Sequence, residues 1–364
     1  MNQKKIIDKP TLVYVIGPRF CVYSLAHESL KLLSEKYNVV CISEGPHIAD
    51  EAFEHKPIRF VRVPSVFSDV VSLFQVLFIF INLKSIDKIV ISTPKAAFLT
   101  AIVCKIARKS YIYLHRGAVY QNYSGLKLDV FKRIDLFIIR NSSKTTYISK
   151  SLQTWVCDAL GIEGVNYTRT FNSSKGVDLD KFRPRSRKHH LDKVTIGYCG
   201  RISTDKGFSS LKEVMHKYSG NKEIRIIIKG SNELNGTDTL QLEHYLASNN
   251  IEYLEWSDDV SGFFDQIDVL FFPSKREGFG NVAIEAAASG VPTIAFDIPG
   301  IFDAVSDGNS GILCKPGGDI VALLDQLIRD KEKLAEMSLN SRVVAKRLFD
   351  QEMVLRDIHM DMNL

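Results

Sequence analysis

Short apolar runs alternate with amphipathic stretches along most of the chain. The first half has runs rich in β-branched residues, which predict strands at residues 11–16, 38–43, 58–63, 87–92 and 110–114. Stretches with helical periodicity lie between them, at residues 24–36, 68–83 and 95–108. Strands that alternate with helices indicate a parallel sheet with helices on both faces.

The same pattern begins again after a polar segment. Residues 172–192 contain few apolar side chains and include a basic run, which is typical of a linker. Five further apolar runs predict strands at residues 193–199, 223–229, 251–254, 268–272 and 291–296. We therefore predict an α/β domain over residues 1–170, a linker over 171–192 and a second α/β domain over 193–340.

The most apolar stretch is uncharged but short. Asp69 and Lys84 enclose only the 14 residues 70–83, whereas a membrane-spanning helix needs about 20. The stretch therefore predicts a buried or interfacial helix. Six cysteines show neither CxxC nor zinc spacing, and the first ten residues are too polar for a secretory signal. We expect reduced thiols in a cytoplasmic protein.

Charge is divided unevenly between the two halves. Residues 1–170 carry 23 Lys and Arg and 13 Asp and Glu, a net charge of +10, while the rest of the chain carries −5. A basic half favours an anionic partner, such as an anionic membrane surface or a phosphate-bearing acceptor. A solvated basic face explains the same charge. No stretch has a known nucleic-acid motif, so we expect no nucleic acid as partner.

The strongest chemical signal is the sequence PSKREGFGNVAIEAAASGVP at residues 273–292. It follows an apolar run, and Gly278 and Gly280 on either side of Phe279 allow the backbone to approach a ligand closely. A helix opening at Asn281 would direct its free N–H groups at such a ligand. Two carboxylates, Glu277 and Glu285, stand eight residues apart and could contact separate parts of an elongated molecule. Two exposed surface acids beside a turn are the simpler interpretation.

A second signal is the loop CGRISTDKGF at residues 199–208. Gly200 permits a turn after the apolar run, and Arg201 and Lys206 follow it. An arginine and a lysine in a loop after a strand suit a diphosphate, and fixed cations stabilise charge that develops on a leaving group. A solvated basic loop would look the same.

Taken together, these motifs resemble those of family-4 glycosyltransferases, which are retaining enzymes of the GT-B architecture. The resemblance covers nearly the whole chain and is strongest over residues 168–320. Its most specific part is the Glu277-x7-Glu285 element, in that order after Arg201 and Lys206. The implied fold has two Rossmann-like domains facing across a cleft, with a C-terminal helix over residues 341–364 packing back on the N-terminal domain.

The resemblance implies a role for each motif. Arg201 and Lys206 would hold the donor diphosphate, with Gly17 and Gly200 in the adjoining loops. Glu277 and the N–H groups of Phe279, Gly280 and Asn281 would bind the donor sugar or phosphate. Glu285 would bind the nucleotide ribose. His115, which ends a predicted strand, would contact a hydroxyl of the transferred sugar, although it could equally satisfy local backbone groups.

The implied reaction moves a sugar from a UDP- or GDP-sugar to a saccharide or lipid-linked saccharide acceptor. The resemblance suggests a hexosyltransferase of bacterial surface polysaccharide or lipopolysaccharide assembly, cytoplasmic and peripheral at the inner membrane. A nucleotide-sugar epimerase or hydrolase, or a catalytically silent homologue, remains as an alternative. We expect no metal cofactor. The Asp178-x-Asp180 pair resembles a metal-binding DxD motif, but Arg201 and Lys206 already supply positive charge.

Three positions depart from the family pattern. The loop after the first strand has Gly17 but lacks a second glycine. Asp303 stands where a glutamate is more usual, and Ser231 follows Gly230 in place of a second glycine. These departures leave the base pocket and the first loop's contact with the diphosphate undetermined.

Overall fold

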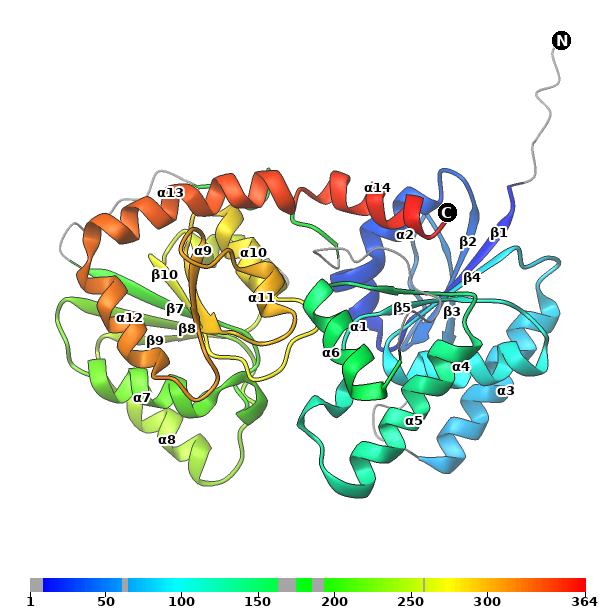
Figure 1. The fold of residues 1–364 in the computed structure, drawn as a ribbon, viewed down its shortest axis with the longest axis horizontal. Helices are drawn as coiled ribbons and strands as arrows, with labels where there is room; N and C mark the ends of the chain where they lie inside the picture. The colour runs from blue at the N-terminus through cyan, green and yellow to red at the C-terminus, as the bar shows by residue number, and fades with distance from the viewer. Residues whose placement is uncertain (1–8, 61–64, 163–174, 185–192, 258) are drawn as a thin grey trace, which may run out of the picture. The chain divides into compact units, whose positions relative to one another are not determined.

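The fold is described from a computed structural model, over residues 9–60, 65–162, 175–184, 193–257 and 259–364 (Figure 1). The chain forms two compact units. Unit 1 comprises Met1–Ile148, Leu152–Lys175 and Leu355–Leu364, and unit 2 comprises Ser149–Ser151 and Gly176–Val354. The predicted linker residues 171–174 and 185–192 lie outside the described residues.

Unit 1 is built on a six-stranded parallel sheet with the order β3-β2-β1-β4-β5-β6. Val13 at its centre pairs with Val40 on one side and Ile89 on the other, and all three are buried. The strands are β1 (Thr11–Val15), β2 (Asn38–Glu44), β3 (Glu54–Ile58), β4 (Lys88–Ser92), β5 (Ile112–His115) and β6 (Lys144–Tyr147).

Helices cover both faces of this sheet. Helix α4 packs against α3 and α5, and Figure 1 shows the three together on one side of the sheet. The helical segments are α1 (Arg19–Cys21), η1 (Val22–Ala26), α2 (His27–Leu33), α3 (Val66–Asn82), α4 (Pro94–Ile106), η2 (Val119–Asn122), α5 (Gly125–Asn141) and α6 (Lys150–Leu160). None of the helices in the described part of the chain is long and apolar enough to cross a membrane.

Unit 2 repeats the architecture with the parallel strand order β12-β11-β10-β7-β8-β9. Its strands are β7 (Val194–Cys199), β8 (Ile224–Lys229), β9 (Ile251–Leu254), β10 (Val269–Phe272), β11 (Thr293–Phe296) and β12 (Gly311–Cys314). Its helical segments are η3 (Thr204–Lys206), α7 (Phe208–Tyr218), α8 (Thr237–Leu246), α9 (Ser261–Phe264), α10 (Asn281–Ala288), α11 (Ile301–Ala304), α12 (Ile320–Arg329) and α13 (Lys331–Leu348).

The C-terminal helix α14 (Gln351–Asp361) begins in unit 2 and continues into unit 1. Its buried His359 forms a 2.7 Å hydrogen bond between Nε2 and the hydroxyl of Ser29 in α2. The Lys36 ammonium donates to the main-chain carbonyl of Leu364 at 3.2 Å. The end of the chain is therefore fixed to unit 1, which agrees with the predicted return of the C-terminal helix.

Most predicted strands occur where the hydrophobic pattern places them, but one is displaced. We predicted a strand at residues 58–63, of which residues 61–63 lie outside the described residues, and in the described part β3 ends at Ile58. Ile58 pairs with Glu44, the last residue of β2, so Arg59 has no further strand residue of β2 to pair with. The N–H of Arg59 instead donates to the side-chain oxygen of Gln75 in α3. Pro57 is tolerated because β3 is an edge strand.

Candidate functional site

The loops after β7 and β10 lie directly against each other in unit 2. Gly207 has φ +82, and a Cβ atom at this position would be 2.0 Å from the carbonyl oxygen of Pro273. Only glycine therefore fits between the two loops. The N–H of Lys275 also donates to the carbonyl of Asp205 at 2.9 Å. This packing carries Lys206 to the loop that contains Glu277.

Lys206 and Glu277 form an ion pair in this position. The Lys206 ammonium lies 2.6 Å from Oε1 of Glu277 and 3.4 Å from the carbonyl oxygen of Arg276. The two side chains are 18% and 15% exposed. The sequence predicted both residues for the site but not that they pair. The cation is thus fixed in place with part of its surface open to an anionic ligand.

Arg201 is held by two carboxylates. Its guanidinium donates to Glu233 at 2.5 Å and to Asp205 at 3.3 Å. Asp205 also accepts from Arg276 at 3.3 Å and from the Ser203 hydroxyl at 2.6 Å. Burial acts to raise the pKa of Asp205, but the Ser203 hydrogen bond and the Arg201 and Arg276 charges outweigh it and lower that pKa. Asp205 therefore stays ionised between two guanidinium groups.

Asp205 and Glu233 were not predicted as site residues. Asp205 stands inside the predicted loop, and Glu233 belongs to the segment after Gly230 where the chain departs from the family pattern. Burial acts to lower the pKa of Arg201, but the hydrogen bond from Arg201 to Glu233 and the charge of Asp205 raise it. A Cβ atom at position 230 would be 1.8 Å from the carbonyl oxygen of Gly200, so the loops after β7 and β8 also touch.

The glycine-rich loop leads into α10 as predicted. Gly280 is the N-cap residue, the helix runs Asn281–Ala288, and Gly290 follows it with φ +70. Phe279 is 5% exposed, and its ring packs edge-on against Phe349 with centroids 6.0 Å apart. The N–H of Asn281 donates to the carbonyl of Phe279 at 2.9 Å. Phe279 can therefore serve a ligand through its backbone alone.

Glu285 lies in the second turn of α10 and is 7% exposed. Burial raises the pKa of the Cys199 thiol, and the negative charge of Glu285 raises that pKa further, while the positive charge of Lys229 acts to lower it. Glu285 is therefore near Cys199, the last residue of β7. Lys229, which is 8% exposed and donates to the carbonyl of Glu255 at 3.3 Å, is a buried cation that the sequence analysis missed.

Gly17 and His115 belong to unit 1. The N–H of Gly17 donates to the Thr93 hydroxyl at 2.8 Å, and Thr93 has φ 64, an uncommon value for a β-branched residue. Gly17 and Thr93 follow β1 and β4, the neighbouring strands at which the strand order reverses, where open α/β sheets bind ligands.

His115 is fully buried at the end of β5. Its Nε2 lies 3.0 Å from the Asp135 carboxylate, which also accepts from the hydroxyl of Tyr120 at 2.9 Å. The imidazole lies between the rings of Tyr113 and Tyr147, with centroids 5.2 and 5.1 Å away. Its Nδ1 has no hydrogen-bond partner among the described residues. The contact with a sugar hydroxyl stays a prediction.

With this geometry established, comparison with known proteins shows what the chain is similar to. The sequence pattern of the family described as "glycosyl transferases group 1" matches residues 180–344. The capsular polysaccharide biosynthesis glycosyltransferase CapM of Staphylococcus aureus is 29% identical over 81% of this chain and 80% of its own length. The chain is therefore similar to group 1 glycosyl transferases, most clearly over residues 180–344.

Solved structures agree with the assignment at the level of the fold. HepE of Anabaena, solved with UDP and glucose, aligns with a TM-score of 0.77 at 18% identity over 97% of this chain and 99% of that one. WaaG, a glycosyltransferase involved in lipopolysaccharide biosynthesis, aligns with a TM-score of 0.76 at 14% identity over 96% and 99%. The chain therefore has the GT-B architecture that its motifs predicted.

The DxD-like pair, Asp178 and Asp180, lies in a turn that is held by hydrogen bonds. The Asp178 carboxylate accepts from the backbone N–H groups of Asp180 and Lys181, both at 2.9 Å. Arg342 in α13 holds the same turn by donating to the carbonyl of Leu179 at 2.9 Å. Within the described ranges, no three His, Cys, Asp or Glu side chains are grouped so that they could hold a metal ion.

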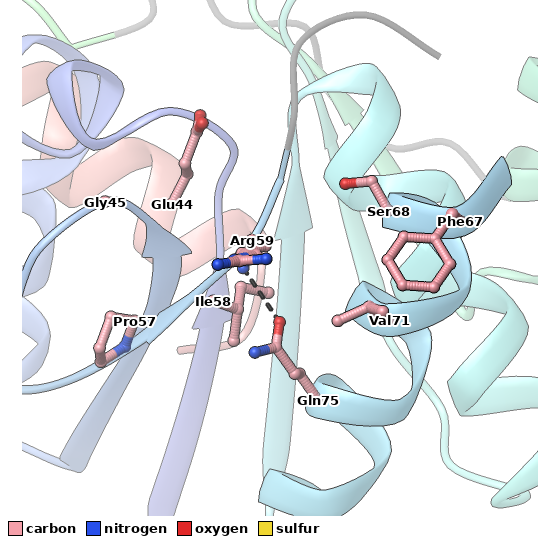
Figure 2. A pocket seen from close by; sticks show the side chains of 9 residues that line it. All are labelled: Glu44, Gly45, Pro57, Ile58, Arg59, Phe67, Ser68, Val71 and Gln75. Atoms are coloured by element: carbon pink, nitrogen blue, oxygen red, sulfur yellow. Dashed lines mark hydrogen bonds between the residues drawn. The ribbon is translucent and has the colours of Figure 1, made fainter. Parts of the chain in front are cut away.

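Unit 1 also contains a cavity that was not predicted. It has a volume of about 530 Å³ and lies between the ends of β2 and β3 and the first turns of α3 (Figure 2). Figure 2 shows the Gln75 side chain directed toward the backbone of Arg59, whose N–H it accepts at 3.0 Å. Its lining residues are Glu44, Gly45, Pro57, Ile58, Arg59, Phe67, Ser68, Val71 and Gln75.

Proposed function

We propose that this protein is a retaining hexosyltransferase that needs no metal ion and uses a nucleotide sugar, most simply a UDP-sugar, as donor. The observation that carries the proposal is the partly open Lys206–Glu277 ion pair beside Arg201. Together they place two cations and a carboxylate at the carboxyl ends of parallel strands, where such sheets bind ligands. HepE, with the same fold, was solved with UDP-glucose.

The proposed donor replaces carboxylates as the partner of the two cations. In the free protein Lys206 contacts Glu277, and Arg201 contacts Glu233 and Asp205. A bound diphosphate would draw Lys206 and Arg201 toward its own oxygens. Negative charge grows on this diphosphate as its bond to the sugar breaks, so both cations stabilise the transition state more than the ground state.

The released Glu277 carboxylate would then accept hydrogen bonds from hydroxyl groups of the donor sugar. The backbone at Gly278 to Gly280 and the N-terminus of α10 would face the sugar or phosphate, whereas the N–H of Asn281, which was predicted to bind the donor, already donates to the carbonyl of Phe279. Glu285, near the end of β7, would bind the ribose. Gly200, whose φ of +148 favours glycine, would form the turn that precedes Arg201, and Gly17 and His115 remain predicted contributors from unit 1.

We further propose a saccharide or lipid-linked saccharide acceptor that is used in surface polysaccharide assembly. CapM acts in capsular polysaccharide biosynthesis and WaaG in lipopolysaccharide biosynthesis. The 530 Å³ cavity near Arg59 and Gln75 is large enough for part of such an acceptor. A lipid-linked acceptor would lie at a membrane, so an anionic membrane surface would be a further partner of the basic half.

A screen of nucleotide sugars tests the proposed function. Full-length protein is incubated with each donor, with and without a saccharide acceptor, and the released nucleoside diphosphate and the sugar product are measured. The proposal expects release that requires the acceptor and leaves the sugar's anomeric configuration unchanged. Isomerised donor without transfer would favour an epimerase, and no turnover with any donor would favour a silent homologue.

A further inference from the structure

Helix α3 exposes a continuous apolar stripe. Its large apolar side chains recur at intervals of three and four residues, so they share one face of the helix. The stripe consists of Phe67, Val70, Phe74, Phe78 and Ile81, which are 78%, 44%, 66%, 68% and 72% exposed. Other positions of α3, including Val76 and Phe80, are buried. An exposed patch of this kind marks a binding surface in a water-soluble domain.

The region that contains the α3 stripe is basic. Residues 66–141 contain eleven Lys and Arg, four Asp and no Glu, a net charge of +7. Helix α4 packs against α3 and α5 on the same side of the sheet (Figure 1). Two of the four acids are neutralised or hidden, because Asp69 pairs with Lys95 at 2.6 Å and Asp135 is buried. The exposed cations of this region are Lys84, Lys105, Arg108, Lys109, Lys127, Arg133 and Arg140.

We propose that the α3 stripe is a membrane-binding surface that inserts into the headgroup region of an anionic bilayer. The aromatic and aliphatic side chains of α3 would enter the acyl boundary while lysines and arginines of α4 and α5 meet lipid phosphates. The 17 residues of α3 span about 25 Å as a helix, which suits a helix lying along the surface. This step extends the proposed function, but binding itself requires no sugar transfer.

The positive charge decides between a bilayer and a second copy of the chain. Two copies that paired through the α3 stripe would bring two regions of net charge +7 together, which costs free energy. An anionic bilayer satisfies both the apolar stripe and the surrounding charge. Phe67 also lines the 530 Å³ cavity, so the stripe leads to a space that could receive the head of a lipid-linked acceptor.

Vesicle flotation with the full-length chain tests this surface. Vesicles of phosphatidylcholine with about 30% phosphatidylglycerol are compared with pure phosphatidylcholine at low and high salt. Phe74→Ser/Phe78→Ser should lower the partition coefficient on anionic vesicles about 100-fold, roughly tenfold for each side chain removed. The matched control, Leu339→Ser/Val343→Ser, removes two exposed apolar side chains of α13 in unit 2 and should bind as the unaltered protein does.

A second variant reports insertion directly. In Phe74→Trp, anionic vesicles should shift the tryptophan emission to shorter wavelength, whereas the same substitution at Leu339 should show no shift. Equal partitioning of the double variant and its control would overturn the proposal, as would an unshifted emission. If light scattering shows a dimer of the original protein and a monomer of Phe74→Ser/Phe78→Ser, the stripe serves self-association instead. Donor turnover measured without vesicles separates failure of this surface from failure of the proposed function, because neither Phe74 nor Phe78 belongs to the donor site.

Discussion

Replacing Lys206 with alanine removes the cation that the structure holds most firmly in the donor site. Its ammonium lies 2.6 Å from Glu277, and both side chains are more than four-fifths buried. Loss of one preorganised charged or hydrogen-bonding group costs about 10²–10³ in kcat, or about 3–4 kcal/mol of transition-state stabilisation. The free energy of unfolding should fall by only about 1–2 kcal/mol, because the loss of an exposed ion pair costs less than this and the loss of a fully buried one costs more.

The assay is steady-state release of the nucleoside diphosphate, with unfolding followed in parallel. Lys212→Ala is the matched control, since Lys212 is a half-buried lysine on α7 that contacts Gln241 at 3.0 Å and lies outside the predicted site. It should keep the original kcat. Lys206→Ala and Glu277→Gln combined should cost less than the sum of the single changes, because the two groups touch. A kcat for Lys206→Ala within about threefold of the original would refute the assignment of this lysine.

Three further predictions follow from the same contacts. Glu285→Ala should raise the Kd for the nucleoside diphosphate about tenfold or more with little change in kcat, whereas Glu277→Ala should impair binding and turnover together; equal, purely catalytic defects would contradict these roles. Turnover should persist in excess EDTA, since cations and a helix N-terminus meet the leaving-group charge, and loss of activity that Mn²⁺ restores would contradict this. Burial lowers the pKa of His359 to about 4 from an ordinary 6.5. Between about pH 6.5 and pH 4, His359 is therefore protonated in the unfolded chain but neutral in the folded chain. Proton binding stabilises the unfolded chain, so this group lowers the free energy of unfolding by about 2 kcal/mol between about pH 7 and pH 5. His359→Gln should remove this decrease in the free energy of unfolding, as measured by urea unfolding at the two pH values. The same pH dependence in the variant and the original protein would show that His359 is not buried as described.

The identity of the donor-site residues could be predicted from the sequence, but their pairing could not. Arg201, Lys206 and Glu277 stand in loops after apolar runs, and the parallel-sheet rule places such loops at one edge. The ion pair between Lys206 and Glu277 depends on Gly207 fitting against Pro273, a contact between segments about 70 residues apart that no local pattern records.

Other features depend on tertiary context in the same way. The apolar run that begins at Ile58 has strand propensity, but β2 ends opposite Ile58, so the described residues Arg59 and Phe60 have no further residue of β2 to pair with. The apolar run at residues 70–83 predicted a buried or interfacial helix. In the structure α3 has apolar side chains on two faces, of which one is buried and the other is exposed. His115 is predicted for the site by its position after a strand, yet only the structure reveals Asp135 and the tyrosines around it.

Calorimetric titration of UDP into the full-length protein tests the central claim most directly. The account predicts one saturable site, whose affinity falls at least tenfold in Lys206→Ala and in Arg201→Ala and is unchanged in Lys212→Ala, because the diphosphate binds the two site cations. GDP titrated in the same way shows which base the site prefers. Binding of either nucleotide with equal affinity to all three variants, or binding of neither, would contradict the assignment of a nucleotide-sugar site to these residues.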